Sequence, residues 1–224
     1  MRESVRRVRE HFSTIQITMV SIVVALALQE WLDRLPTVDA LWQPSWVAVR
    51  VWCQALVSFA IILKMWTGFV LAAATTQRVP RPIDLIGPMG ILVFVDAQIA
   101  CIDVDHALRW LYILGVGSLA AAAFIAGQRM SFEATPGTDA GTARAFSSLP
   151  DPATVETWIG AAALAFALGH QTIGFGEGGL LAVCAVLLVV QLASATGPIL
   201  AWRILYRRET ELLHAQRGDG AQPS

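Results

Sequence analysis

Two charged side chains, Lys64 and Asp96, stand inside long apolar segments of this 224-residue chain. A charge surrounded by hydrocarbon is costly, so such residues usually face the interior of a helix bundle or water. Counted from the arginine-flanked end of its segment, Lys64 is about 11 residues deep and Asp96 about 13, which at 1.5 Å per residue is roughly 16–20 Å. Adjacent antiparallel helices would bring the two side chains together, and we predict an ion pair between Lys64 and Asp96.

This predicted pair has two readings. In the first, it is a static tie that neutralises two charges and fixes the register of two helices. In the second, it is a titrating or ion-gating element, because intramembrane charges often mark the paths of ions and protons. The residue types alone leave both readings open.

The first apolar segment carries a distinct face. Thr14, Thr18, Ser21, Ala25 and Leu28 follow a 4-3-4-3 spacing, so they share one side of a helix. Small and hydroxylated residues permit close approach of another helix. The alternative is a narrow pore, in which hydroxyl groups are followed by an apolar constriction.

Few other residues are arranged for chemistry. His106 and His170 lie near carboxylates, but no histidine spacing typical of a metal site is present, and we expect no metal and no cofactor. The cysteines are scattered through apolar segments, where they are expected to be small buried hydrophobes: Cys53, Cys101 and Cys184. No nucleophile, base and orienting group cluster in the sequence, so an enzyme is not expected.

The composition shows which elements must position these residues. Hydrophobic residues make up 55% of the chain, charged residues only 15%, and the mean hydropathy is +0.58. A soluble domain usually carries about 25% charged residues. The surroundings of most of this chain are therefore lipid, and the length is nearly used up by membrane-spanning helices. The basic residues flank apolar segments, so nucleic-acid binding is not expected.

The apolar runs predict an all-α, polytopic membrane protein with about six transmembrane helices, because a run in lipid must pair its backbone internally. The predicted spans are 13–32, 46–75, 83–104, 107–127, 155–173 and 180–205. With this threading, twelve arginines lie on one side and three on the other, and Lys64 lies within a span. By the positive-inside rule, both termini are cytoplasmic and the protein is a multi-pass protein of the inner cell membrane.

The predicted outer loops are acidic, with six carboxylates against three arginines. This pattern is typical of a mouth that attracts cations. It also arises without function, because the positive-inside bias leaves outer loops poor in basic residues. The carboxylates are those of Glu30, Asp33, Asp39, Asp103, Asp105 and Glu177.

One connection is longer than the others. Residues 128–154 are rich in glycine, serine, threonine and proline, and we predict a flexible cytoplasmic linker there. It divides the chain into a four-helix membrane part (1–127) and a two-helix membrane part (155–206), followed by a cytoplasmic tail (207–224).

The first two segments also carry local motifs. Arg9-Glu10-His11-Phe12-Ser13-Thr14 opens the first, and Ser58-Phe59-Ala60 leads to Trp66 in the second. In these motifs, order and length, the chain resembles prokaryotic relatives of the lysosomal potassium channel. Thr14 stands where their Phe-Ser-Asp motif has aspartate, and Thr67-Gly68-Phe69 lacks their histidines. The resemblance implies six-helix subunits in an oligomer, with the first helix lining a potassium pathway.

Three functions remain as hypotheses. The first is an oligomeric cation channel, potassium-like, with Thr14, Thr18, Ser21, Ala25 and Leu28 lining the pore. The second is a non-catalytic membrane subunit that packs in a larger complex. The third is a small proton-coupled transporter that uses Lys64 and Asp96. In each case the expected surroundings are a lipid bilayer, and the expected partner is another copy of the chain or a membrane complex.

Overall fold

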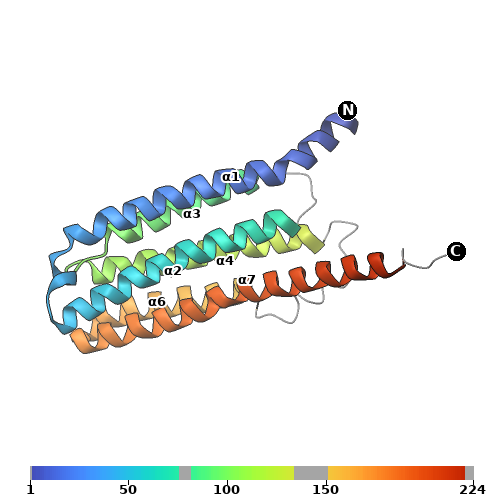
Figure 1. Ribbon diagram of the computed structural model, residues 1–224. Coiled ribbons are helices and arrows are strands. Elements are labelled where there is room, and N and C mark those ends of the chain that lie inside the picture. The colour runs from blue at the N-terminus through green and yellow to red at the C-terminus, as the bar shows by residue number, and fades with distance from the viewer. Residues whose placement is uncertain (1, 76–81, 134–150, 220–224) are drawn as a thin grey trace.

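The computed structural model describes residues 2–75, 82–133 and 151–219, and its regular elements in these ranges are all helices (Figure 1). The long helices are α1 (Arg2–Arg34), α2 (Trp46–Thr75), α3 (Pro82–Ala100), α4 (Ala107–Glu133), α6 (Pro152–Ile173) and α7 (Glu177–Asp219). Two short 3-10 helices, η1 (Leu35–Thr37) and η2 (Asp39–Trp42), connect α1 to α2. The all-α prediction is confirmed for the described residues.

The long helices lie side by side in one bundle, and the two ends of the chain lie at the same end of it (Figure 1). We call this the terminal end, and the other the opposite end. Helices α2 and α7 both begin at the opposite end and run toward the terminal end, so they are parallel (Figure 1). Placement of both termini on one side of a membrane agrees with this arrangement, and the assignment of that side to the cytoplasm stays a prediction.

Within the described residues, five helices are long and apolar enough to cross a membrane, namely α1, α2, α4, α6 and α7. Helix α3 contributes a shorter apolar stretch, Ile86–Ala100. The outer surface of the bundle carries many large apolar side chains, which in water would form an unfavourable patch but in lipid need no cover. They include Ile22, Leu26, Val93, Trp158, Ile173, Val186 and Val189. The chain is thus built as a multi-pass membrane protein.

The helix boundaries follow from local chemistry. Helix α6 begins where the Asp151 side chain accepts a hydrogen bond from the backbone N–H of Ala153, with Pro152 in the first turn. It ends at Gly174, whose φ of 71° suits glycine. The predicted span 83–104 is wrong at its end: α3 stops at Ala100, because the next backbone groups form turn bonds, including Cys101 N–H to Gln98 O.

The most extensive helix packing joins α2 to α7 and α4 to α6. The α4–α6 contact is close because Gly115 and Gly160 face each other: a Cβ added at Gly160 would lie 2.8 Å from the Gly115 carbonyl oxygen. Both parts of the predicted four-plus-two division therefore share one bundle. Within the predicted linker, α4 extends through Glu133 and α6 begins at Pro152, and residues 134–150 lie outside the described ranges.

All three cysteines are buried, which gives a test of the membrane topology. Burial raises the pKa of the Cys101 thiol, against the lowering effect of Arg109 and Arg34, so little reactive thiolate forms at neutral pH. We expect a membrane-impermeant maleimide to leave the native protein unlabelled in intact cells or oriented vesicles. Asp105→Cys and Arg207→Cys, both at exposed positions, should label from opposite sides of the membrane.

The arrangement in Figure 1 would be contradicted if those two added cysteines labelled from the same side. Unfolding in dodecyl sulfate serves as the positive control, because it exposes the native thiols and should make all three of them reactive.

Candidate functional site

The most unusual feature of the bundle is a buried cluster around Lys64 of α2. Its Nζ donates to Oε1 of Glu156 on α6 and to Oε1 of Gln191 on α7. A third contact, at 3.3 Å, reaches Oγ of Ser194, also on α7. Two helices, α6 and α7, thus supply three oxygen atoms to one ammonium group on α2. We call these four residues the Lys64 cluster.

The electrostatics of the cluster are those of a buried ion pair. The side chains of Lys64 and Glu156 are only 17% and 8% exposed. An ammonium group has three N–H donors, and all three find acceptors here. The Glu156 carboxylate supplies the counter-charge that such burial requires. The amide nitrogen of Gln191 stays buried without a hydrogen-bond partner, so neither of its two N–H groups is used.

The cluster also joins the two helix pairs. Lys64 and Gln191 belong to the α2–α7 pair, and Glu156 belongs to the α4–α6 pair. Contact between α6 and α7 is slight compared with the packing inside each pair. The Lys64–Glu156 ion pair therefore links the α2–α7 helix pair to the α4–α6 helix pair.

The predicted partner of Lys64 was Asp96, and the structure does not bring these two residues together. Asp96 lies only four residues, about 6 Å, from the last residue of α3, at the opposite end of the bundle. Helix α2 begins at that same end of the bundle, and Lys64 lies 18 residues, about 27 Å, from its first residue. The prediction failed because it assumed that helices adjacent in sequence pack most closely and begin at the same depth.

A second ion pair lies near the opposite end of the bundle. Nε of Arg50 on α2 is 3.1 Å from Oε2 of Glu177 on α7, and Nη2 of Arg50 donates to the Val104 carbonyl at 3.1 Å. The Arg50 side chain is 1% exposed and that of Glu177 is 56% exposed.

Two contacts between α2 and α7, one an ion pair and the other a hydrogen bond, share one register. Arg50–Glu177 and Lys64–Gln191 are both separated by 127 residues in sequence. Arg50 and Lys64 are 14 residues apart, as are Glu177 and Gln191, which places the pairs about 21 Å apart along the parallel helices. Fourteen residues are two heptads, so each helix keeps one face toward the other. Buried polar or thiol side chains lie between the two pairs on these helices: Cys53, Gln54, Ser58 and Cys184.

Nothing matches this chain among protein-family models, among curated proteins or among solved structures. The likeness to relatives of the lysosomal potassium channel rests on the sequence motifs alone.

The five residues predicted to line a pore share one side of α1, as their spacing indicates. Thr14, Thr18 and Ala25 are exposed, and Ser21 and Leu28 are partly buried. The Thr18 hydroxyl donates to the Thr14 carbonyl of its own helix at 2.9 Å. The neighbouring face of α1 packs into the core instead, through Val20, Val23 and Ala27. In this single chain, no other described helix covers Thr14, Thr18 or Ala25.

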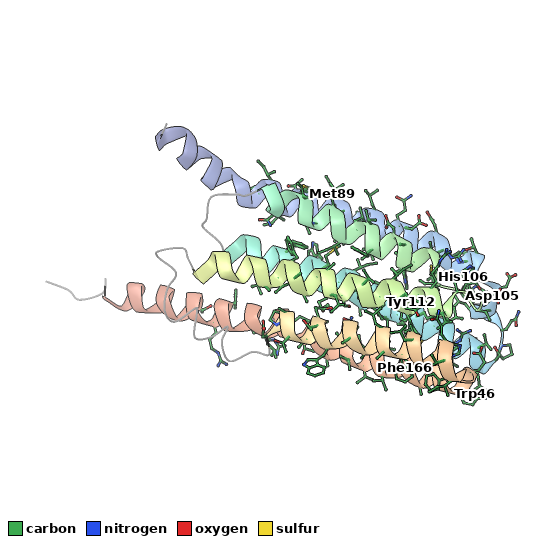
Figure 2. The ribbon with its side chains drawn as sticks, turned by 180° about the vertical axis from the view of Figure 1, so that it is seen from behind. Trp46, Met89, Asp105, His106, Tyr112 and Phe166 are labelled. Carbon is green, nitrogen blue, oxygen red and sulfur yellow. The ribbon has the colours of Figure 1, made fainter. Side chains whose placement is uncertain are left out.

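His106 and His170 lie at the opposite end of the bundle, and no metal cluster is formed within the described residues. His106 lies beside Asp105 (Figure 2), and its Nδ1 is 3.8 Å from Oδ2 of Asp103. The ring of His170 packs on Phe175, with centroids 6.1 Å apart. Neither histidine contacts the Lys64 cluster.

Sequence reasoning missed the residues that complete the cluster. Glu156 is the second residue of the predicted span 155–173, and Gln191 and Ser194 lie within the predicted span 180–205, whose residues are mostly apolar. One signal was present: Arg50 and Lys64 are two heptads apart on one helix, and so are Glu177 and Gln191 on another. Matching spacing of complementary residues on two helices indicates a shared seam.

Proposed function

We propose that this protein is a proton-coupled membrane transporter in which the Lys64–Glu156 ion pair is the coupling element. The observation that carries the proposal is the burial of this pair between two helix pairs, with Lys64 also bonded to Gln191. Intramembrane ionisable residues are rare and commonly form proton relays. The proposal keeps the transporter hypothesis from the sequence and replaces Asp96 by Glu156.

The chemistry of coupling is simple. When a proton binds Glu156, an O–H bond forms and the carboxylate loses its charge. Lys64 keeps its own protons and its bonds to Gln191 and Ser194, so it stays with α7. The attraction that holds α6 to the α2–α7 pair weakens, and α6 can then shift relative to α2 and α7. A two-state element of this kind is what alternating access requires.

Flux through proteoliposomes tests this function. Purified protein is reconstituted in liposomes that contain the pH dye pyranine, and potassium chloride, sodium succinate, sodium phosphate or sodium sulfate is added outside. We expect one of these solutes to change the internal pH through the wild-type protein, and Glu156→Gln to remove that change. An amide cannot carry the transferred proton, so coupling should fall to the level of protein-free liposomes.

Asp96→Asn is the matched control, because it also converts an intramembrane carboxyl group to an amide but lies outside the Lys64 cluster. It should retain the pH change. Proton movement that survives Glu156→Gln, or the absence of proton movement with every solute, contradicts the proposed function. Loss of the pH change in Asp96→Asn alone would instead favour Asp96, and not Glu156, as the carboxyl group that carries the proton.

A second candidate function is the oligomeric cation channel. The observation that favours it is the exposure of Thr14, Thr18 and Ala25 on α1, which leaves small and hydroxylated side chains available to line an axis between copies. The likeness to relatives of the lysosomal potassium channel points the same way. Potassium flux without proton movement, blocked by Thr18→Trp, would support the channel. A monomer without potassium flux would exclude it.

A further inference from the structure

A second group of buried polar atoms lies about 21 Å from the Lys64 cluster, around Arg50 and Gln54. Arg50 is fully buried, yet its Nη1 has no hydrogen-bond partner. Its Nε is 3.1 Å from the Glu177 carboxylate but lacks the alignment of a hydrogen bond. Gln54, one turn further along the same face of α2, is 0% exposed, and neither its Oε1 nor its Nε2 has a partner.

These atoms are not expected to stay unpaired in a folded bundle. A buried polar group without a hydrogen bond costs about 1–3 kcal/mol, and more if it is charged. Four polar atoms on two successive turns of one helix therefore indicate that something else contacts them: Arg50 Nε and Nη1, and Gln54 Nε2 and Oε1. Three of the four are donors, so the missing group must mainly accept hydrogen bonds.

Two neighbouring helices carry further unpaired donors. The Arg50 guanidinium donates to Val104, in the connection between α3 and α4. Gln98, near the end of α3, and Trp110, in the first turn of α4, are both buried, and Gln98 Nε2 and Trp110 Nε1 have no partner. This end of the bundle is thus rich in unused N–H groups on both sides of the segment that Arg50 contacts.

Glu177 shows which chemistry fits beside Arg50. It is a carboxylate, and it approaches the guanidinium without forming a well-aligned bond. Its side chain is 56% exposed, so it can turn away into solvent at little cost. An arginine is always charged and binds carboxylate and phosphate groups well. An incoming oxyanion would therefore compete with Glu177 for Arg50, and the Gln54 amide lies one helical turn away on the same face of α2.

We propose that Arg50 and Gln54 form a binding site for an oxyanion group of a small solute, and that Glu177 is the displaceable carboxylate that holds the empty site closed. The binding site stands without the transport function. Its further role, as the place where the transported solute first binds, rests on the proposed function. The Lys64 cluster then supplies the proton and the Arg50 site selects the anion.

Equilibrium binding to the purified full-length protein in detergent tests the site. The probes are radiolabelled succinate, phosphate and sulfate, which separate a carboxylate from inorganic oxyanions. The carboxylates of the loops at this end slow the approach of an anion, so the measurement uses about 0.15 M sodium chloride to screen exposed charges. We expect at least one probe to bind the wild-type protein saturably, in competition with the others.

Two variants give opposite results. Gln54→Leu keeps the size of the side chain but removes its amide, and should weaken binding about tenfold or more, which is the usual effect of a hydrogen bond to a charged group. Glu177→Gln removes the competing carboxylate at an exposed position, and should tighten binding about tenfold. Because one variant loses affinity and the other gains it, loss of fold does not explain both.

The proposal is overturned if none of the three probes binds either the wild-type protein or Glu177→Gln. It is also overturned if Gln54→Leu, eluting as a folded protein, binds as tightly as the wild type. Glu156→Gln separates this site from the proposed function: it should bind the probe normally while failing to move protons. Normal binding with no proton movement by the wild-type protein would keep the site and reject the transporter.

Discussion

Replacing Lys64 by methionine will lower the free energy of unfolding of the bundle by about 3 kcal/mol, because it leaves the Glu156 carboxylate buried without a counter-charge. Gln191 and Ser194 lose their shared donor in the same step. The measurement is unfolding in dodecyl sulfate, followed by circular dichroism of the detergent-purified protein. Glu156→Gln alone should cost less, because the Lys64 ammonium keeps Gln191 and Ser194 as acceptors.

The double variant Lys64→Met with Glu156→Gln decides whether the pair acts as a unit. Removal of both charges leaves no uncompensated ion, so the double variant should be more stable than Lys64→Met. A double-variant loss equal to the sum of the two single losses would show that Lys64 and Glu156 do not interact in the folded protein. Thr67→Val, one turn from Lys64 on α2, is the control for a polar substitution outside the cluster, and should change stability little because Thr67 bonds only its own helix.

The sequence predicts the position of the helices well for a physical reason. Hydrocarbon of about 30 Å requires about 20 apolar residues, and arginines mark the ends. The second predicted span coincides with α2 (Trp46–Thr75), and the fourth coincides with the apolar part of α4 (Ala107–Gly127). The third extends past α3, because Cys101 and Ile102 are as apolar as a helix interior although their backbone turns.

Hydropathy and arginine positions do not predict the partner of Lys64. Hydropathy gives the depth of a residue along a helix but not which helices pack together. The most extensive packing of α2 is with α7, more than a hundred residues away in sequence, and not with α3. The partner also depends on depth, because Glu156 lies about 6 Å inside the start of α6, close to where a span is expected to meet the interface.

The predicted pore-lining face of α1 is a second case in which spacing alone does not show what a helix face contacts. A 4-3-4-3 spacing establishes that Thr14, Thr18 and Ala25 share a face, but it is silent on whether that face turns toward the core or away from it. In the structure, the core side is taken by Val20, Val23 and Ala27, whose branched or small side chains pack against neighbouring helices. Polarity is a poor guide to the buried side here, because apolar side chains are favourable in the core and in lipid alike.

The close approach of α4 and α6 leads to the second large effect. Gly160→Leu should destabilise the protein by at least about 1–3 kcal/mol, the usual range for overpacking. A Cβ at Gly160 lies 2.8 Å from the Gly115 carbonyl oxygen and 2.8 Å from Cγ of Leu119. A backbone oxygen cannot rotate away, so α6 itself must move. Unfolding in dodecyl sulfate measures the change.

Gly68→Ala is the matched control, because Gly68 also lies within a helix but a Cβ there meets no atom within 4 Å. Alanine should stabilise that position by about 0.5–1 kcal/mol, since it restricts the unfolded chain. Displacement of α6 by Gly160→Leu also moves Glu156, one turn away, from Lys64, so proton coupling in liposomes should fall together with stability. If Gly160→Leu were as stable as Gly68→Ala, the α4–α6 contact could not be the one that holds Glu156 against Lys64.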